Sequence, residues 1–131
     1  MKGITLITRQ GLSYNDGAPI IKKEFSELQL TSDEKPQKEE EGCLYFGKTP
    51  NCLIVYFSPN DILSEEEGFT KDELQRIPFV PHATDVNFRR YGVVLRLIEA
   101  LLPSFPELYV LDDEEDYLGP AADFIKKHGT I

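Results

Sequence analysis

The residues of this sequence whose types and spacing could do chemistry are acids that follow two apolar runs. Asn60 and Asp61 come shortly after Cys52–Phe57 (CLIVYF), and an acidic run comes directly after Leu108–Leu111 (LYVL). The acidic run consists of Asp112, Asp113, Glu114, Glu115 and Asp116. If the two apolar runs were parallel strands, both sets of side chains would lie at one edge of a sheet, where α/β proteins bind ligands.

Carboxylates from two strand ends are ligands that Mg²⁺ prefers in proteins. Asp61, Asp112 and Asp113 are therefore the candidate catalytic residues of a small metal-dependent hydrolase or phosphotransferase. The alternative is a solvated acidic turn between a strand and a helix, and an acidic chain offers many such runs. We favour this alternative, so we predict no bound metal and no cofactor.

Other catalytic motifs are poorly supported. His82 and His128 are the only histidines, and neither lies in a serine- or cysteine-containing motif. Residues 42–49 (GCLYFGKT) match the bare pattern of a phosphate-binding loop. The middle of this segment is bulky and apolar, and Pro50 stands where a helix should begin, so the segment is expected to form a hairpin instead. A binding protein is favoured over an enzyme.

The strongest helix signal runs from Asp85 to Leu102, before Pro103. Its apolar residues recur at spacings of three and four, which places them on one broad face of a helix. Thr84 or Asp85 is the expected N-cap. The pattern predicts one long central helix in which Leu95 and Ile98 are almost wholly buried.

Strands are expected before and after this helix. Ile4–Thr8 alternates and is β-branched, Leu44–Phe46 and Cys52–Phe57 flank a turn, and Leu108–Leu111 is short and apolar. The order of Cys52–Phe57, the helix and Leu108–Leu111 suggests a right-handed crossover between parallel strands, with room for one strand between them.

Three short helices complete the expected fold. A capping box opens one at Thr70, Ala121–His128 is another, and Pro19–Leu28 is favoured as a third, although Ile20–Thr31 also fits a strand. The sequence thus predicts a single α+β domain over residues 1–131, with a mixed β-sheet, one long central helix packed on it and short flanking helices. Residues 31–42 are charged and contain a proline, which predicts a mobile acidic loop.

Composition limits the classes of partner. The chain has 131 residues, a formal charge of −9 and a pI of about 4.7. Repulsion opposes direct binding to nucleic acid or to an anionic membrane. The N-terminal residues do not resemble a signal peptide, and Cys43 and Cys52 are expected to be reduced, so we expect a cytoplasmic protein.

Acidic runs interspersed with aromatic residues favour recognition of a positively charged protein, because charge steers association and aromatic rings anchor it. The predicted contact residues are Asp112, Asp113, Glu114, Glu115, Asp116 and Tyr117. We interpret the chain as a non-enzymatic, acidic protein-binding module, and as an inhibitor that neutralises a basic toxin or nuclease. Bacterial immunity proteins and antitoxin-like inhibitors are of this general type, although no motif here identifies one of their families. A structural adaptor is a third alternative.

Overall fold

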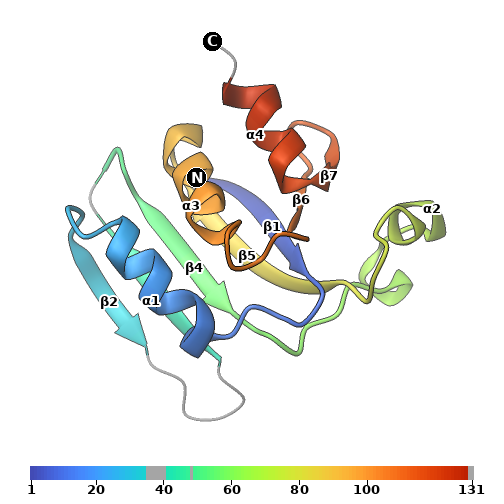
Figure 1. Cartoon of the computed structure of the whole chain (residues 1–131), viewed down its shortest axis with the longest axis horizontal. Coiled ribbons are helices and arrows are strands. Elements are labelled where there is room, and N and C mark those ends of the chain that lie inside the picture. Colours follow the sequence, from blue (N-terminus) through green and yellow to red (C-terminus); the bar gives the residue numbers. More distant parts are fainter. Residues whose placement is uncertain (35–40, 48, 130–131) are drawn as a thin grey trace.

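The computed structural model describes residues 1–34, 41–47 and 49–129, and shows helices packed on a seven-stranded sheet (Figure 1). The strand order is β2-β3-β4-β5-β1-β6-β7, and every neighbouring pair is antiparallel. The strands are β1 (Lys2–Thr8), β2 (Leu30–Glu34), β3 (Gly42–Phe46), β4 (Leu53–Phe57), β5 (His82–Phe88), β6 (Tyr109–Asp112) and β7 (Tyr117–Pro120). The helices are α1 (Tyr14–Glu24), α2 (Lys71–Gln75), α3 (Tyr91–Leu101) and α4 (Ala121–Gly129), with a 3₁₀ turn, η1 (Glu65–Glu67). The predicted α+β class is confirmed, but the pairing is antiparallel and not mixed.

The main core lies between the sheet and three helices, α1, α3 and α4. Alternate strand residues such as Leu6, Val86 and Phe88 are wholly buried on this side. Ile21 of α1 and Leu97 of α3 meet them from the helix layer. Removal of this apolar surface from water is the dominant stabilising term for the domain.

The expected long central helix is wrong. The segment His82–Phe88 is strand β5, and α3 begins only at Tyr91, with Arg90 as its N-cap. Phe88 and Tyr91 are three residues apart, a spacing that also fits a helix, although Phe88 is a strand residue. Ile98 is buried as expected, whereas Leu95 is only half-buried, because the face of α3 that meets the sheet is centred on Val94 and Leu97.

The expected parallel crossover from β4 to β6 is also wrong. Two strands, β5 and β1, lie between β4 and β6. Because each neighbouring pair is antiparallel, β4 and β6 run in opposite directions. Helix α3 instead connects β5 to β6, which run parallel to each other on either side of β1. The sequence interpretation missed this arrangement because it assigned half of β5 to the helix.

Several local predictions are confirmed. Strand β1 forms at Ile4–Thr8, β3 and β4 pair as a hairpin, and α4 covers the predicted C-terminal helix. Thr70 and Glu73 form the predicted capping box at α2. The N-terminal helix is present but begins at Tyr14, and the first part of the expected acidic loop, through Glu34, is strand β2. Residues 35–40 of that loop lie outside the described residues.

The edge strand β2 is fastened to α1 through Asp33. The Tyr14 hydroxyl donates a hydrogen bond to Asp33, and the ammonium of Lys22 lies 2.5 Å from the other carboxylate oxygen. Burial and the bond to Asp33 raise the pKa of Tyr14, and the same carboxylate raises the pKa of Lys22. These contacts hold the neighbouring residue, Glu34, at the edge of the sheet.

The face of the sheet opposite the helices is only partly covered. The segment between β4 and β5, which contains η1 and α2, lies away from the helix layer (Figure 1). Its Leu63 and Ile77 form a second, smaller core with Ile7 and Leu111. This cover extends over parts of β1, β5 and β6, and none of the described helices lies over the same face of β2, β3 and β4.

We expect Leu97→Ala to lower the free energy of unfolding by about 2–5 kcal/mol, because it leaves a cavity in a wholly buried part of α3. Urea denaturation measures this change. The matched variant Leu95→Ala should cost clearly less, since Leu95 is half-buried. Equal denaturation midpoints for Leu97→Ala and the unmodified protein would contradict the assigned core.

Candidate functional site

The acidic run forms the turn between β6 and β7. Asp112 pairs with Tyr117 at the ends of the two strands, and residues 113–116 connect them. Asp112 itself has no exposed surface. Its Oδ2 accepts a hydrogen bond from the Tyr91 hydroxyl at 2.8 Å, and its Oδ1 accepts one from the Glu114 amide at 3.1 Å. A buried carboxylate is tolerated only when such donors satisfy it, so Asp112 anchors the turn and is not available to a partner.

The four following acids, Asp113 to Asp116, are exposed. The Asp116 amide donates to the Asp113 carbonyl at 3.2 Å, and Asp116 adopts a left-handed conformation with φ of 51°. Aspartate tolerates this conformation better than most residues. Lys2 and Lys127 are the nearby basic side chains: the first lies 4.0 Å from Glu114, and the second donates to the Glu115 carbonyl. The turn therefore presents several carboxylates on a fixed backbone.

Tyr117 lies between this turn and α4 and is half-buried. Its ring packs against Phe124 with centroids 5.1 Å apart, and its hydroxyl donates to the Pro120 carbonyl at 2.7 Å. Burial raises its pKa. Tyr117 therefore supports the turn, and only part of its ring is available for a contact.

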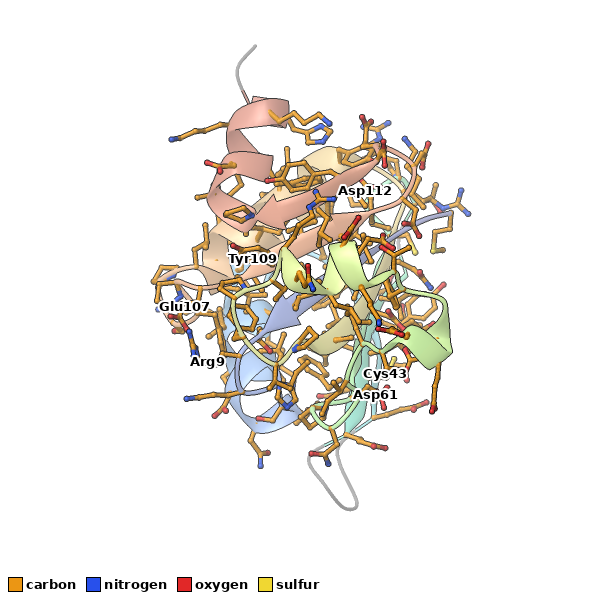
Figure 2. The ribbon with its side chains drawn as sticks, turned by 90° about the vertical axis from the view of Figure 1, so that its right-hand side faces the viewer. Arg9, Cys43, Asp61, Glu107, Tyr109 and Asp112 are labelled. Atoms are coloured by element: carbon orange, nitrogen blue, oxygen red, sulfur yellow. The ribbon has the colours of Figure 1, made fainter. Side chains whose placement is uncertain are left out.

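The structure separates the candidate metal ligands. Asp61 follows β4, and Asp112 ends β6. Because β4 and β6 run in opposite directions, the C-terminal end of one strand lies far from the C-terminal end of the other. Figure 2 shows Asp61 and Asp112 well apart. Within the described ranges, no group of three or more His, Cys, Asp or Glu residues is placed to hold a metal ion. The alternative that joined Asp61 to Asp112 and Asp113 is not supported by this geometry.

The two histidines have local structural partners, and the two cysteines are unlinked. A ring nitrogen of His82, Nδ1, lies 3.1 Å from the Val80 carbonyl, and the ring of His128 stacks on Tyr91. Cys43 and Cys52 are free thiols. Burial, followed by the charge of Glu34, raises the pKa of Cys43, which keeps it protonated and weakly nucleophilic at neutral pH.

A small cavity of about 150 Å³ lies beside Arg9 at the end of β1. Arg9 lies beside Glu107 (Figure 2), and its guanidinium makes two hydrogen bonds to the Glu107 carboxylate, at 2.5 and 3.1 Å. The same guanidinium lies over the ring of Phe79. Because this charge is already neutralised, the cavity offers little to an anionic ligand.

The sequence interpretation missed residues on the face of the sheet that the helices leave uncovered. Tyr45, Tyr56 and Asp85 lie there, beside a shallow hollow of about 870 Å³ that Tyr45 and Tyr56 help to line. The run Cys52–Phe57 is apolar almost throughout, yet Tyr56 is 39% exposed. The hydroxyls of the two tyrosines and the alternation of Asp85 and Asn87 with Val86 and Phe88 were the available signals.

Comparison of the chain with protein-family models, curated proteins and solved structures gives no match. Among the helices that the structure describes, none is both long enough and apolar enough to cross a membrane.

We expect Tyr91→Phe to destabilise the protein by about 1.5–3 kcal/mol at pH 7, because it removes a hydrogen bond to a buried carboxylate. Burial, followed by the bond to Asp112, raises the pKa of Tyr91 above its ordinary value of 10.0. The protonated form is therefore favoured in the folded state. The contribution of the Tyr91 hydroxyl to the free energy of unfolding is fully present below about pH 10, and it declines as the pH rises toward the folded-state pKa.

The measurement is urea denaturation at a series of pH values from 7 to 11. The unfolding free energy of Tyr91→Phe should fall less steeply above pH 10 than that of the unmodified protein. The matched variant Tyr56→Phe, at an exposed position, should change the unfolding free energy at pH 7 by less than about 0.5 kcal/mol. Parallel alkaline curves for Tyr91→Phe and the unmodified protein would show that Tyr91 does not supply this pH dependence.

Proposed function

We propose that this protein is a non-enzymatic, acidic protein-binding module that inhibits a positively charged partner protein, such as a toxin or a nuclease. The acidic turn at residues 113–116 supports this proposal most directly. Its carboxylates are exposed, and they stand on a backbone that the buried Asp112 holds in place. Groups that are already ordered lose less conformational entropy on binding than mobile side chains do.

The overall charge acts in the same direction. A formal charge of −9 on 131 residues produces a negative potential that steers a basic protein toward the surface and raises its association rate. Nucleases carry basic surfaces that bind phosphate groups. An acidic protein that covers such a surface blocks the substrate without chemistry of its own, which fits the local contacts of the two histidines described above.

The alternative of a metal-dependent hydrolase or phosphotransferase lacks a comparable observation. A metal site would require Asp61 to lie beside Asp112 or Asp113. Asp61 instead lies at the opposite end of the strands from Asp112 and Asp113. Asp112 is moreover occupied by Tyr91 and by the amides of the turn. The binding function is therefore the one that the described residues favour.

The test is to capture proteins from cells of the native host on the immobilised chain, to purify the captured partner, and to measure its binding and activity. We expect a basic partner whose activity is inhibited and whose affinity falls with salt. Asp113→Lys with Glu115→Lys should reduce the association rate about tenfold or more. The double variant should fold normally, since exposed substitutions usually change stability by less than about 0.5 kcal/mol.

A matched control reverses Glu65 and Glu66, which are exposed on η1. Both double variants change the formal charge equally, so a difference between them reports position and not total charge. If the η1 variant weakens binding while the turn variant binds normally, the turn is not the contact surface. If the captured partner is acidic and salt does not affect its binding, the proposed function is wrong.

A further inference from the structure

The pairing register shows which side chains share the uncovered face of the sheet. Directly opposed residues of antiparallel strands point to the same face. Glu34 pairs with Cys43, Cys43 with Tyr56, Tyr56 with Asp85, and Asp85 with Thr5. These five residues form one row that crosses five strands, from the edge strand β2 to β1.

A second row runs beside the first. Ser32 pairs with Tyr45, Tyr45 with Ile54, Ile54 with Asn87, and Asn87 with Gly3. Gly3 has no side chain, so the second row ends in a depression of about 310 Å³. Asp113 of the acidic turn lines this depression together with Asp85, and the two rows are therefore continuous with that turn. We call these two rows, with Asp113, the open face.

The open face has the chemistry of a site for cationic side chains. Glu34, Asp85 and Asp113 are exposed carboxylates, and Glu41 lines the hollow beside Glu34. None of these four acids forms an ion pair with a residue that the structure describes. The rows themselves contain no lysine or arginine. The helix layer differs, because its Arg96 is paired with both Glu24 and Glu27.

The position of Tyr56 adds an aromatic surface to this charge. Tyr56 is 39% exposed on β4 and stands directly opposite Asp85 on β5. Opposed residues of an antiparallel pair have their Cβ atoms about 4.5–5.5 Å apart. A guanidinium group can therefore lie over the tyrosine ring and pair with the carboxylate, which combines a cation–π contact with an ion pair.

We propose that the open face is the docking surface for the positively charged partner protein, and that it binds an arginine of that partner between Tyr56 and Asp85. This inference rests on the proposed function, and it adds the location of the main contact and the side chain recognised. The acidic turn then forms one rim of the surface through Asp113, and Glu34 forms the opposite rim.

The spacing of the acids indicates the size of the recognised segment. Neighbouring strands are about 4.8 Å apart, so Asp85 lies roughly 10 Å from the strand that leads to Asp113 and roughly 14 Å from β2 with Glu34. An extended chain advances about 3.3 Å per residue. Basic residues three and four positions apart in an extended segment therefore match the three carboxylates.

A second copy of this chain is a less suitable occupant. Two open faces would bring their carboxylates together, and like charges across an interface oppose association. The partner that neutralises this surface has the opposite charge. Self-association through this face would appear as a dimer of the unmodified protein that Asp85→Asn strengthens.

The test is to titrate the full chain with the capped peptide Arg-Gly-Ser-Arg-Gly-Ser-Gly-Arg at low ionic strength. Amide chemical shifts of the protein report the binding. The same peptide with citrulline in place of arginine is the neutral control. We expect saturable shifts in β3, β4 and β5, centred on Tyr56, with a Kd on the order of 1 mM. The citrulline peptide should cause none of these shifts.

Three variants, each of which removes one negative charge, locate the contact: Tyr56→Ala with Asp85→Asn, Glu66→Gln and Glu114→Gln.

Tyr56→Ala with Asp85→Asn should weaken binding about tenfold. Tyr56→Phe alone, which leaves the charge unchanged, should retain binding because the ring remains. Glu66→Gln on η1 should leave the affinity within about twofold, because it lies outside the open face. Glu114→Gln in the turn should have an effect no larger than that of Glu66→Gln.

Alkylation of Cys43 gives an independent measurement. Cys43 lies in the first row beside Tyr56, whereas Cys52 is only 2% exposed and serves as the internal reference. The arginine peptide at saturation should slow the reaction of Cys43 with iodoacetamide severalfold, and the citrulline peptide should not.

The outcomes separate this inference from the proposed function. If Glu114→Gln abolishes binding while Tyr56→Ala with Asp85→Asn does not alter it, the open face is not the docking surface, and the proposed function stands on the turn alone. If every variant weakens binding in proportion to charge, the interaction is unspecific and the inference is wrong. If the arginine peptide causes no saturable shift and no protection of Cys43, the open face does not bind arginine and the inference is wrong, whereas the proposed function is decided by the captured partner.

Discussion

The burial of a single face of the sheet under α1, α3 and α4 is the constraint on which the rest of the structure depends. The large apolar side chains of these helices all meet the sheet from one side, where Ile21, Leu97 and Phe124 are wholly buried. Among the described residues, the segment that contains η1 and α2 covers one part of the opposite face. The helix layer stabilises the domain, and the uncovered part of the sheet becomes a surface that can bind.

The buried carboxylate of Asp112 links this core to the acidic turn. Tyr91 belongs to the first turn of α3, and its hydroxyl holds one oxygen of Asp112 while the amides of the turn hold the other. The position of the exposed acids at residues 113–116 thus depends on the packing of α3. An acidic run that could have been a mobile loop is instead part of the rigid scaffold, and its first member, Asp113, adjoins the open face.

Local patterns in the sequence predicted the elements whose signal is local. The alternation in Ile4–Thr8, the capping box at Thr70 and the hairpin of β3 and β4 all follow from neighbouring residues. The start of α3 was misplaced because Phe88 and Tyr91 fit a helical period, whereas His82–Phe88 alternates with the period of a strand. Strand β7 gave little signal, since Gly119 and Pro120 make up half of it.

The open face was beyond local prediction for a different reason. Glu34, Tyr56 and Asp85 are far apart in the chain, and they share a row only because β3 pairs with both β2 and β4, and β4 with β5. Such pairings are set by the whole sheet, and a shift of one residue would turn every side chain of a strand to the other face. Composition indicated a basic partner, but the register of four strands determines which residues can meet it.

The structure of the complex between this protein and its purified partner tests the central claim most directly. The account predicts that the partner covers the open face, with a guanidinium group over the Tyr56 ring and within hydrogen-bond distance of the Asp85 carboxylate. A partner that binds the helix layer, or that leaves Tyr56 and Asp85 exposed to solvent, would contradict it.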